Sequence, residues 1–317
     1  YGPNLICAKN DPLITASFRC DPSGPSFESR YSNVGTASSA CTGDNPSVCG
    51  GFFGVFEQPQ AYIHAGDQSN YQNVRIEDVY FHDSSTRFSG LQVHPGCFMM
   101  DNNIAAPAHN LVFDHIVCER TAAVGIQQWD DGVTIQNSVF SPPVFALDQS
   151  APLGRWDQAS WNYQITLECQ TASIPGCTIS DVLIRYNVFV PGGGSTGLLI
   201  RSGGSFGSFS NVRVVGNVFG AGVSCGVAGV RYDSNTFLNG VTSCGTNATT
   251  LPPGDPWVQS SIITPNGSWS AVSLLDAHPD GSPALPSISV PPGSDLDLVT
   301  DADGAPRSEA TRPGAYD

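Results

Sequence analysis

Charged residues are scarce in this sequence, at 13% of 317 positions, and the only lysine is Lys9. A mechanism that needs a lysine base or a Schiff base is therefore excluded from the repeats described below. No apolar run is long enough to span a bilayer, and no signal-peptide pattern stands at Tyr1. We therefore expect a soluble chain without membrane insertion, consistent with a mature form whose leader has been removed.

Several catalytic motifs are absent as well. No serine lies in a nucleophile-elbow context, and the glycines at 192–194 and 203–204 lack the lysine of a phosphate-binding loop. The formal charge is −15 and the sequence pI is about 4.5, so nucleic acid and anionic membranes are poor partners. An acidic polysaccharide would also be repelled unless bound cations bridge it.

What the sequence does contain is a turn-rich β composition, with 34 glycines, 24 prolines and 40% hydrophobic residues. One nine-residue pattern recurs six times. Each copy opens with a turn-former, alternates apolar and polar residues, and closes on an apolar residue, usually phenylalanine. Recurrence at such intervals is typical of stacked coils. The copies are Asn73–Phe81, Asn110–Cys118, Gly132–Phe140, Asp181–Phe189, Asn211–Phe219 and Gly229–Phe237.

A second type of strand alternates with these nonapeptides. Two strand types per turn, joined by polar corners, are what a parallel β-helix requires, with alternate residues pointing into the coil. The predicted strands are Gly90–His94, Gly125–Trp129, Tyr163–Glu168 and Gly197–Arg201, and the expected inward residues are Leu91, Val93, Ile126, Ile165, Leu167, Leu198 and Ile200.

Asparagines near the end of the nonapeptides support this interpretation. Asn187, Asn217 and Asn235 lie two residues before the closing phenylalanine, and Asn137 lies three before its own. Asparagine tolerates left-handed backbone and suits such corners, and stacked copies can form an amide ladder. A role as polar ligands for a substrate is the alternative.

The chain divides into three regions by composition. Residues 1–70 are expected to form an irregular, disulfide-pinned N-terminal cap or first coils, and residues 71–245 the repeats. Residues 246–317 are rich in proline and serine and predict an extended tail that packs along the coils or caps them. Asn247 and Asn266 begin glycosylation acceptor triplets.

Ten cysteines, without zinc-site spacing, indicate an oxidising, extracytoplasmic setting, so we expect a secreted protein. Pairing of neighbours in sequence order would close short local loops. The cysteines are Cys7, Cys20, Cys41, Cys49, Cys97, Cys118, Cys169, Cys177, Cys225 and Cys244.

The nonapeptides resemble those of bacterial secreted right-handed parallel β-helix repeat proteins, a group that overlaps in fold with pectate lyases. The C-terminal stretches Ser282–Leu285, Asp301–Arg307 and Pro313–Asp317 resemble the closing signature of such surface or secreted proteins, although Arg312-Pro313 departs from it. The resemblance implies a right-handed all-β solenoid and export, and it names no reaction.

Aligning the second strand type by its inward residues places His94, Trp129, Glu168 and Arg201 in one outward column. Gln92, Gln127, Thr166 and Leu199 form the column beside it. A tryptophan can stack on a sugar ring while charged groups bind hydroxyls or a uronate carboxylate. The expected partner is therefore an extracellular polysaccharide. An exposed Glu168–Arg201 salt bridge with no function is the alternative.

Two reactions could use this face. A lyase would take Arg201 or His94 as base, with Asp130 and Asp131 as Ca²⁺ ligands, and Ca²⁺ is the only cofactor expected. A hydrolase would pair Glu168 with Asp130 or Asp131. The alternative function is a surface or filament protein, or an adhesin, that self-assembles through coil ends or tail.

Overall fold

The computed structural model describes side chains over residues 110–118, 131–140, 163–169, 176–191, 196–202, 206–253, 278–279, 283–302, 304–308 and 310–316, and the backbone of further strands between 16 and 127. These residues contain no helix, and hence no helical segment capable of crossing a bilayer. All strand pairs among them are parallel except two, β2 with β3 and β23 with β24. The predicted all-β class with parallel strands is confirmed.

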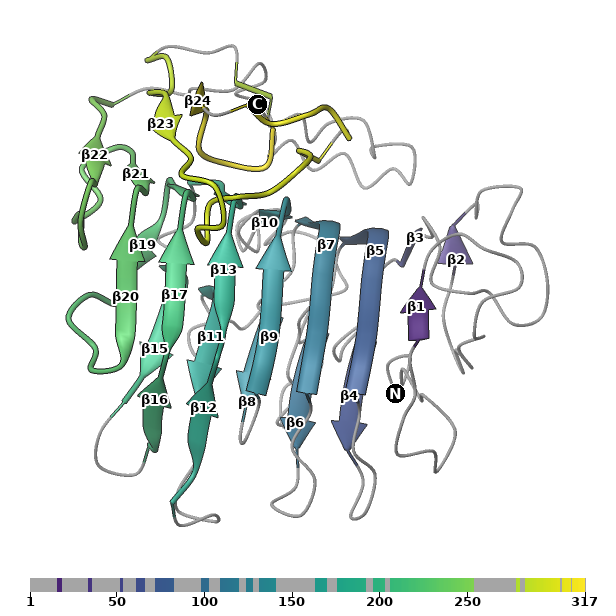
Figure 1. Cartoon of the computed structure of the whole chain (residues 1–317). Coiled ribbons are helices and arrows are strands. Elements are labelled where there is room, and N and C mark those ends of the chain that lie inside the picture. The colour runs from purple at the N-terminus through teal and green to yellow at the C-terminus, as the bar shows by residue number, and fades with distance from the viewer. Residues whose placement is uncertain are drawn as a thin grey trace, which may run out of the picture.

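One parallel sheet has six strands, and its spatial order follows the chain (Figure 1). Each strand therefore pairs with the previous and the next member of the set. The strands are β4 (Ala61–Ala65), β6 (Phe98–Asn102), β8 (Val124–Gln127), β11 (Tyr163–Glu168), β15 (Thr196–Arg201) and β19 (Gly222–Val223).

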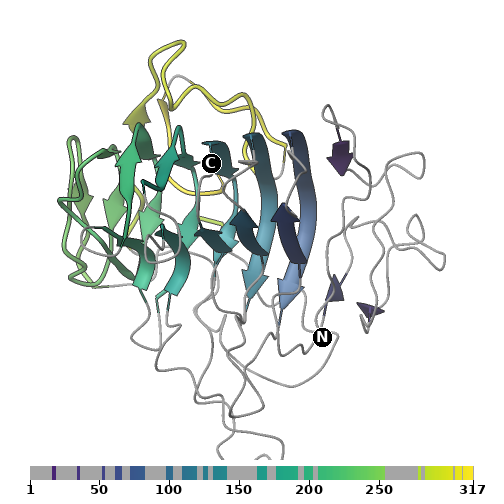
Figure 2. The ribbon, with the colours of Figure 1, turned by 90° about the horizontal axis from the view of Figure 1, so that it is seen from below.

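The second sheet has sixteen strands and is curled (Figure 2). From β4 to β9 the chain visits the two sheets alternately, which brings successive nonapeptides side by side. The strands are β1 (Ala16–Phe18), β2 (Val34–Gly35), β3 (Phe52–Phe53), β5 (Gln72–His82), β7 (His109–Glu119), β9 (Asp131–Gln136), β10 (Val139–Phe140), β12 (Thr178–Ser180), β13 (Leu183–Arg185), β14 (Val188–Phe189), β16 (Ser208–Ser210), β17 (Val212–Val215), β18 (Val218–Phe219), β20 (Val230–Asp233), β21 (Thr236–Phe237) and β22 (Thr249–Thr250).

The nonapeptide bends at two fixed positions, its first and its sixth residue. The first residues Asn110, Gly132, Asp181, Asn211 and Gly229 all have positive φ, as expected for turn-formers. The sixth residues also have positive φ, and this bend separates strands such as β13 and β14. The sixth residues are His115, Asn137, Tyr186, Gly216 and Ser234.

The predicted amide ladder is present at the seventh position. Asn187, Asn217 and Asn235 are at most 1% exposed, and each Nδ2 also donates to backbone carbonyls. The prediction that these asparagines adopt the left-handed conformation themselves is wrong, because the residue before each one does so. Among the four asparagines named above, only Asn137 is itself left-handed, with φ 48°.

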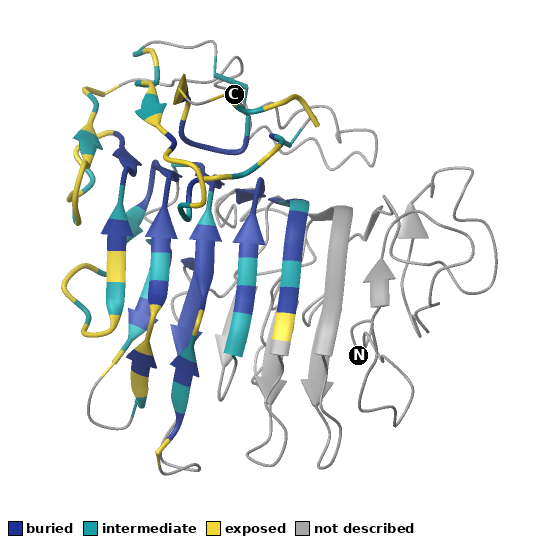
Figure 3. Ribbon diagram, viewed as in Figure 1, coloured by how far each residue is buried: buried dark blue, intermediate teal, exposed yellow. Residues whose placement is uncertain are grey.

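The closing phenylalanines of successive nonapeptides form a continuous stack. The rings of Phe140, Phe189, Phe219 and Phe237 follow one another at centroid distances of 5.3, 4.5 and 5.5 Å. Each phenylalanine is at most 1% exposed, which stabilises the fold by about 1.5–3 kcal/mol per side chain. Figure 3 colours the ribbon by burial, and buried residues dominate the central strands of the described sheets. The nonapeptide pattern thus correctly predicted a buried anchor.

On the six-stranded sheet, four of the predicted inward residues belong to the same core. Ile165, Leu167 and Leu198 are 0% exposed and Ile200 is 5% exposed. Side chains alternate along a strand, so their neighbours face away from the core. The other predicted inward residues, Leu91, Val93 and Ile126, lie outside the residues whose side chains are described.

Part of the C-terminal region packs along the bend at the sixth position, over the upper ends of the strands in Figure 1. This region contains the two-stranded sheet of β23 (Ile288–Ser289) and β24 (Ala310–Thr311). Its anchor is Arg307, whose Nη2 donates to Asn137 Oδ1, Gly314 O and Ala315 O, and whose guanidinium lies 3.9 Å from the centre of the Tyr186 ring. We call residues 283–316 the tail.

Two disulfides join neighbouring cysteines as expected, Cys169 with Cys177 and Cys225 with Cys244. Cys118 is also disulfide-bonded. Its expected partner Cys97, and Cys7, Cys20, Cys41 and Cys49, lie outside the residues whose side chains are described.

Candidate functional site

The predicted pairing of Glu168 with Arg201 is correct. The two residues are partners in the register of β11 and β15, and Arg201 Nη1 lies 3.2 Å from Glu168 Oε2. Their exposure differs sharply, at 0% for the Glu168 side chain and 35% for Arg201. The prediction of an exposed, weak salt bridge is therefore wrong for the carboxylate, and solvent reaches the pair only from the arginine side.

Aromatic rings flank the Arg201 guanidinium. Its Cζ lies 6.0 Å from the centre of the Tyr163 ring and 5.8 Å from that of Phe206. Contacts of this length contribute at most about 1 kcal/mol each, but with Glu168 they limit the orientations of the guanidinium. Burial raises the pKa of Tyr163, the negative charge of Glu168 raises it further, and Arg201 opposes them, so this phenol stays neutral.

The register beyond this pair differs from the predicted one. Glu168 pairs with Gln127 of β8, so Gln127 and not Trp129 occupies the column of Glu168 and Arg201. Asp101 of β6 pairs with Gln127 in turn, and β6 begins at Phe98, after the strand predicted at 90–94. Trp129, His94 and Gln92 lie outside the described residues, as does the side chain of Gln127.

On β11 the other two residues on the face of Glu168 are not solvent-exposed. Gln164 is 2% and Thr166 is 0% exposed, whereas the alternation pattern predicted an outward, accessible row. Gln164 Nε2 donates to Val190 O at 2.9 Å, which links the two sheets. Of the predicted site on β11 and β15, Arg201 is thus the charged group that solvent can reach.

Of the two predicted metal ligands, Asp131 lies on a different sheet from Glu168. Asp131 begins β9 of the sixteen-stranded sheet, where its Oδ1 accepts a hydrogen bond from Ser180 Oγ at 3.1 Å. Asp130 lies outside the described residues. Within the described part of the chain, no group of three or more His, Cys, Asp or Glu side chains could hold a metal ion. The pairing of Glu168 with Asp131 in a hydrolase is not supported, because the two residues are on different sheets.

Of the two glycosylation acceptors, Asn247 is exposed and has positive φ. Its Nδ2 donates to Asp233 Oδ1 at 2.9 Å. The side chain is therefore on the surface, at the last described coil. Asn266 lies outside the described residues.

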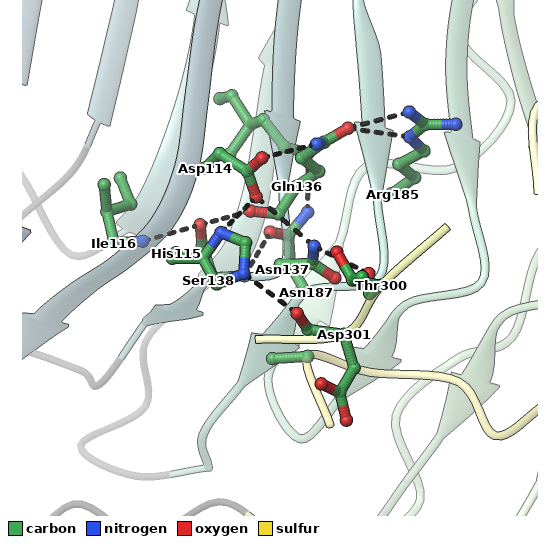
Figure 4. A network of polar contacts seen from close by, with 12 residues as sticks. Asp114, His115, Ile116, Gln136, Asn137, Ser138, Arg185, Asn187, Thr300 and Asp301 are labelled. Atoms are coloured by element: carbon green, nitrogen blue, oxygen red, sulfur yellow. Dashed lines mark hydrogen bonds and ion pairs between the residues drawn. The ribbon is translucent and has the colours of Figure 1, made fainter. Parts of the chain in front are cut away.

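A second polar cluster lies where the tail meets the bend, and sequence reasoning missed it (Figure 4). Asp114 Oδ2 accepts from Gln136 Nε2 at 2.7 Å, and Gln136 Oε1 accepts from Arg185 Nε and Nη2 at 2.9 and 2.8 Å. These residues share the fifth position of their nonapeptides, so they stack across β7, β9 and β13. Burial lowers the pKa of Arg185, and nearby carboxylates, Asp114 first, oppose that effect.

His115 connects this cluster to the tail. Its Nδ1 lies 2.7 Å from Asp114 Oδ1 and its Nε2 lies 2.8 Å from the carbonyl oxygen of Asp301. Asn137 Nδ2 donates to the carbonyl of Thr300 at 3.1 Å beside it. Asp114 is 2% exposed, so we interpret this cluster as the surface on which the tail packs and not as a catalytic site. A polar residue recurring at the fifth position was the signal available in the sequence.

Comparison with protein-family models, with curated proteins and with solved structures gives no match to this chain.

Proposed function

We propose that this protein is a secreted, disulfide-stabilised right-handed parallel β-helix that binds an extracellular polysaccharide along its six-stranded sheet. The alternation of the chain between two parallel sheets supports the helical winding, and parallel crossovers are right-handed in about 98% of cases. Disulfides between sequence neighbours support an oxidising compartment.

The observation that carries the binding proposal is the setting of Arg201. Its guanidinium is fixed by Glu168 and flanked by Tyr163 and Phe206, yet a third of the side chain remains exposed. A planar donor held beside aromatic rings suits a sugar chain, because it donates to hydroxyls in a defined direction. A neutral polymer fits better than an acidic one, since the chain carries a net charge of −15.

Binding is favoured over cleavage by the burial of Glu168. A carboxylate that is 0% exposed and paired with Arg201 is poorly placed to meet a glycosidic bond. A guanidinium is a poor base in proteins, which disfavours the lyase mechanism with Arg201 as base. Lyase and hydrolase activity are retained as outcomes of the experiment below.

The test is affinity electrophoresis of the protein through gels containing neutral or acidic polysaccharides, with and without Ca²⁺. Arg201→Gln should weaken retardation by about tenfold or more, because a charge-assisted donor is lost. Arg201→Lys keeps the charge but not the planar donor, and should bind weakly while Glu168 stays paired. Arg312→Gln, an exposed arginine of the tail, is the matched control. Equal retardation of Arg201→Gln and wild type, or none at all, would overturn the proposal.

The same samples report on catalysis. New unsaturated ends, read by ultraviolet absorbance, would establish a lyase, and new reducing ends alone would establish a hydrolase. Either result would replace binding as the main activity.

A structural role is the second candidate, and the continuous stacks favour it. Three buried asparagines and four phenylalanines run unbroken across the coils and make a stiff body. A filament or spacer protein should form large assemblies, with coil ends or tails in contact. Light scattering after size-exclusion chromatography tests this, and a concentration-independent monomer would exclude the filament.

A further inference from the structure

A cavity of about 410 Å³ lies between the last nonapeptides and the tail, near β20 and β23 in Figure 1. Its floor comes from the ends of β17 and β20, and its wall from tail residues 287–296. The volume is within the range of small-molecule sites. It is separate from the Arg201 face, because β17 and β20 belong to the sixteen-stranded sheet.

Charged groups in this cavity lie close together as ion pairs that are longer than hydrogen bonds. Arg231 Nη2 lies 3.6 Å from Asp233 Oδ2 and 3.8 Å from Asp295 Oδ2, both beyond hydrogen-bond distance. The side chain of Arg231 is 62% exposed. The opposite oxygens of the two carboxylates are already used, Asp233 Oδ1 by Asn247 Nδ2 at 2.9 Å and Asp295 Oδ1 by Arg213 Nη1 at 2.5 Å. Both carboxylates are thus fixed while one oxygen of each faces Arg231.

The rest of the lining is polar and uncharged or aliphatic. Hydroxyls come from both walls, Thr249 on the nonapeptide side and Ser287 and Ser289 on the tail side, and Ile288 and Pro291 add apolar surface. Donors and acceptors of hydrogen bonds are therefore mixed around a partly apolar space. The charged lining residues are Arg231, Asp233 and Asp295, and Asp295 is also paired with Arg213, which lies outside the lining.

We propose that this cavity binds one sugar unit of a neutral saccharide. Sugar hydroxyls both donate and accept, so they can donate to Asp233 Oδ2 and Asp295 Oδ2 and accept from Arg231. The apolar surface of Ile288 and Pro291 suits the C–H face of a pyranose. An anionic ligand would meet two carboxylates, and a cationic ligand would have to compete with Arg231 for them. This site is additional to the proposed polysaccharide face and does not depend on it.

The experiment is saturation-transfer-difference NMR of the full chain with D-glucose, D-galactose, D-mannose and D-xylose, followed by calorimetric titration of the strongest ligand. D-galacturonate and glycine serve as charged probes of similar or smaller size. The protein should carry no glycan on Asn247, as verified by its intact mass, because an attached sugar would stand at the rim of the cavity.

At least one neutral sugar should bind, and Arg231→Gln should weaken it by about tenfold. Ser287→Phe should do the same by filling the cavity while leaving every charge in place. Arg312→Gln should bind like wild type. An unchanged melting temperature of Arg231→Gln is expected, since the side chain is mostly exposed.

Three results would overturn the proposal. One is the absence of binding by any neutral sugar. Another is binding that Arg201→Gln abolishes and Arg231→Gln leaves intact, which would place the sugar on the six-stranded sheet and so support the polysaccharide face instead. The third is tighter binding of D-galacturonate or glycine, which would assign the cavity to a charged ligand. Loss of polymer binding in Arg201→Gln with sugar binding unchanged would show two separate sites.

Discussion

Asn235 Oδ1 accepts two hydrogen bonds from Asn217 of the neighbouring coil, one from its backbone N–H at 2.9 Å and one from its Nδ2 at 3.0 Å. Asn217 Oδ1 does the same for Asn187, at 2.9 and 3.0 Å. Every donor and acceptor in this run is buried, so the removal of one amide leaves several groups without partners.

Asn217→Ala should therefore destabilise the protein by about 3–5 kcal/mol, as expected for a broken buried network. Chemical denaturation with fluorescence detection measures this. Asn211→Gly is the matched control, because Asn211 is exposed and glycine tolerates its φ of 54°. A cost below about 1 kcal/mol for Asn217→Ala would contradict a structural role of the ladder.

Arg307→Lys should loosen the tail without unfolding the coils. Arginine bonds Asn137 and the carbonyls of Gly314 and Ala315 at once, and the lysine ammonium lacks that fork. We expect hydrogen exchange of the tail amides, such as that of Gly314, to accelerate by about tenfold, equivalent to roughly 1.4 kcal/mol. Exchange in β13 and β17 should not change. Arg312→Lys is the control, and acceleration in both variants alike would refute a special role for Arg307.

The buried tyrosines predict a loss of stability at high pH. Burial raises the pKa of Tyr163 and Tyr232 in the folded protein, whereas both ionise normally when unfolded. The unfolded state thus loses their protons first as pH rises, so stability is intact below about pH 10 and falls above it. Absorbance titration should show two phenols that ionise late, together with unfolding. Tyr163→Phe should remove one of them, and normal titration of all tyrosines before unfolding would contradict this prediction.

The two described disulfides should differ in their reactivity toward reductant. Cys169 and Cys177 are 0% and 1% exposed, whereas Cys225 is exposed. A dilute phosphine should therefore open Cys225–Cys244 first. Timed alkylation followed by peptide mass spectrometry gives the order. Simultaneous loss of both would mean that reduction requires global unfolding.

The sequence pattern predicted the parts of the fold that depend on local repetition. The nonapeptides predicted the first bend and the phenylalanine stack, because turn-formers and closing residues recur at constant spacing. The second bend lies one residue before Asn187, Asn217 and Asn235, which were expected to form it. Glu168 and Arg201 were paired correctly since their strands share the same inward pattern. Gln127 was missed as their neighbour because Gly125–Trp129 could be aligned in two ways, and only the pairing of β8 with β11 decides between them.

Other features depend on contacts that no local pattern encodes. The bond from Arg307 to Asn137 spans 170 residues, and that from Tyr186 to Leu296 spans 110. The burial of Glu168 is likewise a tertiary effect, since alternation alone predicts an outward and solvated side chain. The cavity beside Arg231 arises only when the tail meets the last coils. The sequence therefore predicts the repeated strands and bends better than it predicts the burial of Glu168 or the cavity beside Arg231.

The course of the tail has a consequence for how the protein unfolds. In a stacked array each repeat touches only its neighbours, so such arrays can melt from an end, one unit at a time. Here the tail crosses four successive nonapeptides and contacts them through His115, Asn137, Tyr186 and Gly216. Unfolding of one nonapeptide would therefore also disturb the contacts of the tail with the other three. Because the tail bonds four nonapeptides at once, we expect the tail and the sheet to unfold together.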